Sequence, residues 1–185
     1  MNKMMKELLS TGLYLLFVLC LTYIVITYVG QRTIVEGASM ETTLYDGDNL
    51  IVDKLSYRFK EPERFDIIVF PFRYQENTYY IKRIIGLPGE TVQIDEAGNI
   101  YIDSGDGMKL LTETYGKEII RPETIGIAAE PITLGADEYF VLGDNRNNSS
   151  DSRTAVVGNI HRDNIVGKAW VRIWPLNQFK VLEHQ

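Results

Sequence analysis

The chain of 185 residues carries a formal net charge of −6 and has a pI near 5.0. This charge argues against a nucleic-acid partner, because phosphate binding needs a concentrated basic face. The single cysteine, Cys20, excludes an intramolecular disulfide and a cysteine-based zinc site. The two histidines, His161 and His184, lie far apart in the sequence, and we expect both at the surface rather than in a catalytic pair.

The N-terminal region contains an apolar segment, residues 11–30, that has no charged side chain. At 1.5 Å per residue, a helix of about 20 residues crosses a hydrocarbon core of roughly 30 Å. Lys3 and Lys6 precede the segment, whereas mostly acidic residues follow it. The positive-inside rule therefore predicts residues 1–10 in the cytoplasm, a transmembrane anchor over 11–30, and an extracytoplasmic domain over 31–185.

Two other interpretations of the apolar segment fit less well. A cleaved secretory signal needs small residues before the cut, but cleavage after Gly30 places Tyr28 three residues upstream, and cleavage after Ala38 places Glu36 there. A buried core helix should show polar positions along one side, and this segment shows none. We therefore favour an uncleaved anchor.

The rest of the chain predicts an all-β domain. Short runs rich in Val, Ile, Tyr and Phe are bounded by Gly, Pro, Asn or Asp, and no helical periodicity of useful length occurs outside the anchor. The segment 96–99 predicts a hairpin turn, with Gly98 at a positive φ. We expect a barrel-like domain with an inserted β-hairpin region between about Gln93 and Asp137. The expected strands are residues 32–35, 48–55, 66–70, 78–85, 91–95, 99–103, 138–142 and 165–174.

Two short motifs contain residues suited to catalysis, Ser39 in GASMETTL and Lys82 in YIKRIIGLPGE. A serine hydroxyl is a poor nucleophile until a base removes its proton, and neither histidine lies in a motif that suggests this role. Lysine is an alternative base, but at its ordinary pKa only about one lysine in a thousand is neutral near pH 7.5. Burial among apolar side chains can lower that pKa by several units.

The strand pattern leaves the orientation of Lys82 open. Side chains alternate along a strand, so Lys82 and Arg83 point to opposite faces, and both have apolar or aromatic neighbours two residues away. The pattern does not decide which of the two points inward. An ordinary solvated lysine and an ordinary turn serine are the plain alternatives for Lys82 and Ser39.

A third polar segment, 143–153, reads GDNRNNSSDSR and follows an apolar strand directly. Its side chains supply many short-range donors and acceptors, which suit a loop that supports a site. An ordinary surface loop is one alternative. A calcium loop of the EF-hand type is excluded by spacing, because its third position would be Arg146 and its twelfth Ala155.

Taken together, these segments resemble the bacterial type I signal peptidases, also called leader peptidases. The shared order is an anchor, Ser-Met-x-x-Thr-Leu, Lys-Arg-Ile-Ile-Gly-Leu-Pro-Gly-Glu, and Gly-Asp-Asn-x-x-x-Ser-x-Asp-Ser-Arg. The resemblance extends from the anchor to about Trp174. The compact size and single span are similar to the Gram-positive forms, and Lys82 stands where the eukaryotic-like branch has His.

The resemblance implies roles for individual residues. Ser39 would be the nucleophile and Lys82 the general base, and the backbone N–H groups of Ser39 and Gly37 would meet the oxyanion. In some relatives a serine at the position of Gly37 adds a side-chain donor to the oxyanion. Gly37 has no hydroxyl, so this donor is missing here. No metal and no organic cofactor is implied. The residues expected to support the site are Ser149, Asp151, Asp144 and Arg153.

The implied function is that of a membrane-anchored serine endopeptidase, which removes signal peptides from exported preproteins after small residues of the Ala-x-Ala type. The implied partners are signal peptides, the lipid bilayer and the secretion translocon, at the plasma membrane. A self-cleaving Ser-Lys protease of the SOS-repressor type shares the dyad but lacks an anchor. A non-catalytic, membrane-tethered β-domain that assists assembly of surface structures is the alternative from another class.

Thr42 departs from the family pattern, which usually has proline at this position. Proline fixes φ and stiffens the turn after the nucleophile. Because Thr42→Pro touches neither the nucleophile nor the base, we expect preprotein cleavage by this variant to be at least as fast as that of the wild type. A large loss in a side-by-side cleavage assay would show that the turn is built differently.

Overall fold

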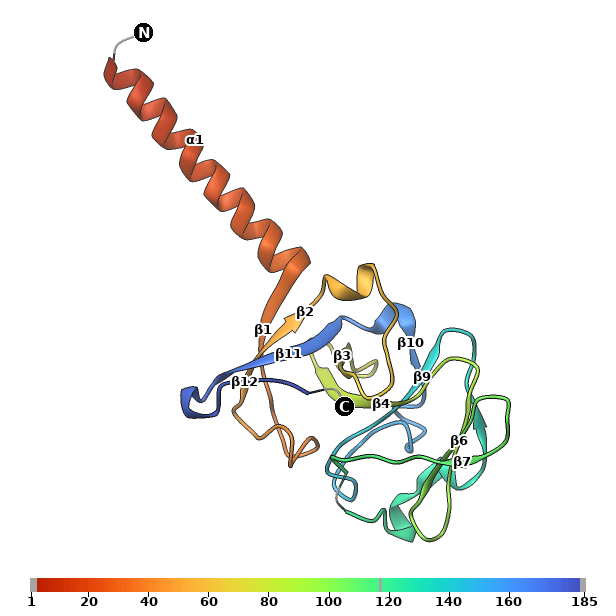
Figure 1. Ribbon diagram of the computed structural model, residues 1–185. Helices are drawn as coiled ribbons and strands as arrows, with labels where there is room; N and C mark the ends of the chain where they lie inside the picture. Colours follow the sequence, from red (N-terminus) through yellow and green to blue (C-terminus); the bar gives the residue numbers. More distant parts are fainter. Residues whose placement is uncertain (1–2, 117, 184–185) are drawn as a thin grey trace.

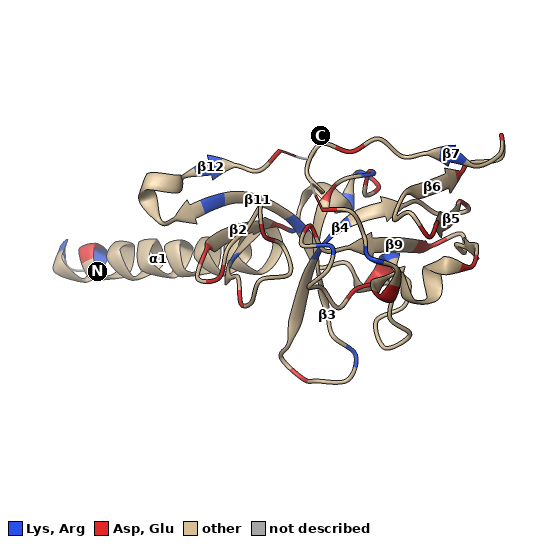
Figure 2. Cartoon of the chain, turned by 90° about the horizontal axis from the view of Figure 1, so that it is seen from below, with Lys and Arg blue, Asp and Glu red and all other residues tan. Residues whose placement is uncertain are grey.

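The computed structural model describes residues 3–116 and 118–183, so His184 lies outside the described residues. Helix α1 spans Lys3–Ile24 and continues as a π-helical turn, Val25–Val29. It projects away from the β-rich domain and has no buried residue (Figure 1). Its charged residues lie at the N-terminal end (Figure 2). Within the described residues this is the one helix that is long and apolar enough to cross a membrane.

The domain after α1 is built from antiparallel strands in two sheets. The larger sheet has the order β1-β2-β11-β3-β4-β9-β10, and β12 pairs with β11. The helical pieces in the described part of the domain are short 3-10 turns, in agreement with the lack of helical periodicity. The strands of the larger sheet are β1 Gly30–Ile34, β2 Asn49–Asp53, β3 Ile67–Pro71, β4 Tyr79–Gly86, β9 Glu138–Leu142, β10 Ile160–His161, β11 Gly167–Trp174 and β12 Lys180–Val181.

The all-β prediction is confirmed, but the expectation of a barrel-like sheet is wrong. The strand order is a path with two ends, β1 and β10, that do not pair with each other, so the sheet does not close. Irregular pairing along β4 and β11 bends the sheet without bringing its ends together. The alternation of side chains reveals which residues form strands, but it does not reveal which strands pair.

The smaller sheet lies within the predicted insertion and has the order β7-β6-β5-β8. The predicted turn at 96–99 joins β5 to β6, with Gly98 at φ 81°. The two-residue strands β7, β8, β10 and β12 are too short to give a sequence signal, and only β10 and β12 belong to the larger sheet. The strands of the smaller sheet are β5 Thr91–Ile94, β6 Ile100–Asp103, β7 Lys109–Leu110 and β8 Ile132–Thr133.

One buried cluster joins the two sheets, with Ile85 and Phe140 from the larger sheet packed against Val92 from the smaller one. Gly86 permits this approach, because a Cβ there would lie 2.5 Å from the Val92 side chain and 3.1 Å from that of Phe140. The insertion is therefore fixed to the C-terminal end of β4, the strand that carries Lys82.

Candidate active site

Ser39 lies in the turn that connects β1 to β2. The base of this turn is closed by two backbone hydrogen bonds, from Val35 N to Asp48 O and from Gly47 N to Val35 O. Met40, the residue after Ser39, is fully buried in the core between the turn and the sheet. This burial fixes the backbone beside Ser39 and leaves the Ser39 side chain only partly covered.

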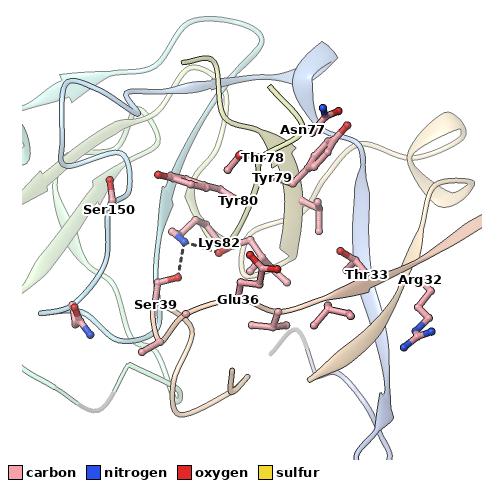
Figure 3. Close-up of a pocket in the computed structure, with 17 residues that line it drawn as sticks. Arg32, Thr33, Glu36, Ser39, Asn77, Thr78, Tyr79, Tyr80, Lys82 and Ser150 are labelled. Atoms are coloured by element: carbon pink, nitrogen blue, oxygen red, sulfur yellow. Dashed lines mark hydrogen bonds between the residues drawn. The ribbon is translucent and has the colours of Figure 1, made fainter. Parts of the chain in front are cut away.

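Lys82 lies in β4 opposite Ile68 of β3, and it is 3% exposed. Its Nζ is 2.8 Å from the Oγ of Ser39 and donates a hydrogen bond to the Ile81 carbonyl, also 2.8 Å away (Figure 3). The ring of Tyr80 has its centroid 5.1 Å from the same nitrogen. Two motifs 43 residues apart in the sequence thus meet at one hydrogen bond.

Burial lowers the pKa of Lys82 from 10.5 to about 8, although the carboxylates of Asp151 and Asp144 act in the opposite direction. Removing an ammonium group from water disfavours the charged form, and here that effect outweighs the two negative charges. At pH 7.5 a base with this pKa is neutral in about a quarter of the molecules, against about one in a thousand for an ordinary lysine. Lys82 can therefore accept a proton from Ser39 near neutral pH.

Arg83 is as buried as Lys82, so both basic residues of the motif point into the protein, on opposite faces of β4. The Arg83 guanidinium donates to both oxygens of Asp144, at 2.9 and 2.7 Å, and to the Phe65 carbonyl at 2.9 Å. The insertion covers one face and the Ser39 turn covers the other. This two-sided cover is why the alternation could not decide between the two residues.

The polar loop 143–153 is held together by the ion pair between Asp151 and Arg153. Asp151 accepts hydrogen bonds from Arg153 Nε and Nη2, both at 2.8 Å, and from Gly143 N at 3.1 Å. Arg153 Nη2 also donates to the Arg146 carbonyl at 2.7 Å. These bonds tie the start, the middle and the end of the loop together in a site with almost no solvent exposure.

The loop also binds the backbone on both sides of the Ser39 amide. Asn145 N donates to the Ser39 carbonyl at 3.1 Å, and Asn145 Nδ2 donates to the Ala38 carbonyl at 3.0 Å. Asp144 accepts from Thr43 Oγ1 at 2.5 Å. Asn145 was not singled out from the sequence, because a side chain that bonds only to backbone leaves no pattern that distinguishes it from its neighbours.

Ser149 lies against the Ser39 backbone but forms no hydrogen bond with Lys82. Its Oγ is buried and has no hydrogen-bond partner among the described residues. A Cβ on Gly143 would lie 2.2 Å from this Oγ and 2.4 Å from the Ser39 carbonyl. Glycine at 143 therefore lets the loop, Ser149 and the Ser39 turn come into direct contact.

The two amides expected to meet the oxyanion differ in their surroundings. Gly37 N donates to Asp46 Oδ1 at 2.8 Å, so it is already engaged. Ser39 N donates to no acceptor within the described part of the chain. The Thr42 amide likewise donates to no described residue, so a proline there removes no hydrogen bond.

A cleft of about 720 Å³ opens beside the Ser39–Lys82 pair (Figure 3). Its walls are β1 and the first half of β4. Among the described strands, β1 pairs only with β2, and the first half of β4 pairs only with β3. Both walls therefore present unpaired backbone groups. No group of three or more His, Cys, Asp or Glu residues in 3–116 and 118–183 is arranged to hold a metal ion. The cleft is lined by residues 32–39, Val69, residues 77–82, Asn148 and Ser150.

Comparison with known proteins places this arrangement in a family. The family model described as "Signal peptidase, peptidase S26" matches residues 8–174. The chain belongs to this family. The resemblance seen in the sequence motifs is thereby confirmed, and the match extends from the anchor helix to the end of β11.

Several curated members of the family are similar to most of the chain. "Probable signal peptidase I-2" of Synechocystis sp. is 39% identical over 84% of this chain and 68% of its own length. "Signal peptidase I" of Leptolyngbya laminosa is 42% identical over 82% and 72%. "Signal peptidase I T" of Bacillus subtilis is 32% identical over 97% and 92%. A crystal structure of a signal peptidase I from Enterococcus faecalis is 35% identical and covers 59% of this chain and 97% of its own, with a TM-score of 0.46.

The burial of the charged Lys82 side chain should lower the unfolding free energy of the protein. Lys82→Met keeps the length of the side chain but has no charge to bury, and we expect it to raise the unfolding free energy at pH 7 by about 1–3 kcal/mol. The gain should shrink as pH rises from about 8 to 10.5, where the folded wild type releases its proton before the unfolded chain does.

Denaturant unfolding of both proteins in detergent across this pH range measures the gain. A variant that is less stable than the wild type at pH 7, or a difference that does not change with pH, would contradict the burial of a charged Lys82.

Proposed function

We propose that this protein is a membrane-anchored serine endopeptidase that removes signal peptides from secreted preproteins after small residues. The observation that carries the proposal is the 2.8 Å contact between Lys82 Nζ and Ser39 Oγ in a buried site. Membership in the signal peptidase family supports it, as do the names of the curated relatives.

The chemistry begins at Ser39. Neutral Lys82 takes the hydroxyl proton while Oγ attacks the scissile carbonyl, and a tetrahedral intermediate forms. The free amide of Ser39 is the donor available to its oxyanion. The Lys82 ammonium then gives its proton to the departing amine, which leaves an acyl ester on Ser39. A water molecule, deprotonated by Lys82, attacks the ester; Lys82 then returns the proton to Ser39 Oγ as the bond to Oγ breaks and the signal peptide is released.

The remaining site residues position this pair. Asp151 and Arg153 close the loop, and Asp144 connects it to β4 through Arg83. We propose that Ser149 borders the reaction space, because its buried hydroxyl has no hydrogen-bond partner among the described residues and lies against the nucleophile turn. None of these side chains has to exchange protons with substrate for the mechanism to run.

The substrate would bind as an extended segment between the two walls of the cleft. The unpaired backbone groups of β1 and of the first half of β4 can each form a ladder with such a segment. The alternating side chains of the substrate then point into the floor of the cleft or out of it. Pockets that admit only small side chains select by excluding larger ones.

The anchor helix would place this cleft at the extracytoplasmic surface of the plasma membrane. Lys3 and Lys6 at the start of α1 favour a cytoplasmic N-terminus, and the β-rich domain follows on the other side. In this orientation the bilayer would hold the enzyme beside signal peptides that remain inserted in the membrane after their preproteins are translocated. The secretion translocon is a further expected neighbour.

Cleavage of a labelled preprotein in detergent or lipid tests the proposal. The wild type should release a mature product whose N-terminus follows a small residue. Ser39→Ala and Lys82→Ala should lower the rate by about 10⁴-fold or more, because members of a catalytic pair act as a unit. Glu96→Ala serves as the control, because Glu96 is exposed in the turn that joins β5 to β6.

Two results would contradict the proposal. An inactive wild type on several preproteins would favour the non-catalytic, membrane-tethered β-domain. Variants that cut as fast as the wild type would show that another group performs the reaction.

A further inference from the structure

The segment Leu111–Gly116, which follows β7 in the insertion, lies against the polar loop; we call it the strap. Its Glu113 carboxylate accepts two hydrogen bonds from the Arg146 guanidinium, at 2.5 and 2.7 Å. Arg146 is 1% exposed and also donates to the Gly143 carbonyl at 3.1 Å. The strap therefore supplies the carboxylate that neutralises a buried arginine of the loop.

A second residue of the strap, Tyr115, covers another buried arginine, Arg83 of β4. The ring centroid of Tyr115 is 3.7 Å from Cζ of Arg83, and the ring meets Phe65 edge-on at a centroid distance of 5.4 Å. The Tyr115 hydroxyl is buried without a hydrogen-bond partner in the described part of the chain. The ring, rather than the hydroxyl, thus makes the contact with the guanidinium.

Arg83 and Arg146 are each adjacent in the sequence to a residue of the site: Arg83 to Lys82, and Arg146 to Asn145. Arg83 follows Lys82 in β4 and binds Asp144, whereas Arg146 lies two residues after Asp144. Between Asp144 and Arg146 stands Asn145, whose amide binds the Ser39 carbonyl. The strap therefore holds the loop on each side of its bond to the nucleophile.

The fit at the end of the strap leaves little room for rearrangement. A Cβ on Gly116 would lie 2.5 Å from Glu113 Oε1 and 2.7 Å from Cζ of Arg146. The strap thus passes directly over the ion pair. Removing Glu113 takes away the carboxylate that binds the buried Arg146 guanidinium, and such a group moves toward water or toward another carboxylate. Removing the Tyr115 ring leaves Arg83 bound to Asp144 but without the ring that packs against its guanidinium.

We propose that the strap is a positioning element of the active site: Glu113 and Tyr115 fix Arg146 and Arg83, and through them keep the Asn145 bond and the Ser39 backbone aligned with Lys82. This proposal rests on the proposed peptidase function. Neither strap residue contacts the cleft, so the strap acts on the rate of the reaction rather than on substrate binding.

Steady-state cleavage by Glu113→Ala and Tyr115→Leu tests the proposal, with kcat expressed per folded molecule. We expect kcat to fall by roughly 10- to 100-fold, because small displacements of a reacting group have effects of this size, while KM stays within about twofold of the wild type. Tyr115→Phe is the matched control for the ring and should retain wild-type kcat. Glu118→Ala is the control for the carboxylate, since Glu118 is exposed and accepts a hydrogen bond from Asn147 of the same loop.

A second measurement does not depend on cleavage. NMR titration of Nζ-labelled Lys82 in the full chain should show a higher pKa in Glu113→Ala, because a displaced loop admits water to the ammonium group and relieves its burial. If the wild type cleaves no preprotein but this pKa changes, the peptidase proposal fails and the positioning role stands.

Three results would overturn the positioning role. If both variants keep the wild-type kcat per folded molecule and only their melting temperature falls, the strap has a purely structural role. A higher KM at constant kcat would make it part of the substrate site. An equal loss in Tyr115→Phe would assign the effect to the hydroxyl.

Discussion

The structure depends on one constraint, the burial of the Lys82 ammonium group beside a serine hydroxyl. A lysine in water is almost always protonated at neutral pH and cannot act as a base. Lys82 is enclosed by the β-sheet, the Ser39 turn and the polar loop, and this burial lowers its pKa to about 8. The larger sheet, the polar loop and the fixed turn each contribute a wall of this enclosure, which costs stability and gives reactivity.

Arginines bind both of the carboxylates that lie near Lys82. Asp144 and Asp151 both raise the pKa of Lys82 and so oppose the effect of burial. Each carboxylate is held in a two-pronged contact, Asp144 by Arg83 and Asp151 by Arg153. These pairs satisfy the carboxylates within the protein and leave Lys82 hydrogen-bonded only to Ser39 and a backbone carbonyl among the described residues. The polar loop therefore shapes the site while its own charges are neutralised.

The sequence predicted the elements that carry local signals and missed those set by long-range pairing. The anchor, the main strands and the Ser39 and Lys82 motifs follow from hydropathy, alternation and motif order. The open sheet could not be predicted, because the local pattern of side chains does not show that its end strands, β1 and β10, do not pair with each other. The inward orientation of Arg83 depends on the insertion that covers it, and the engagement of the Gly37 amide depends on Asp46 nine residues away. Both require the tertiary structure.

The pH dependence of kcat/KM tests the central claim most directly, because it reports the ionisation of groups in the free enzyme. Only neutral Lys82 can accept the Ser39 proton, so cleavage of a preprotein should rise with pH and reach half of its plateau near the pKa of about 8. Stopped assays between pH 6 and about 10.5 would cover this limb, with the substrate concentration kept well below KM. A midpoint near 10.5, the ordinary value for lysine, would contradict the account, because it would show that Lys82 is not buried in the working enzyme.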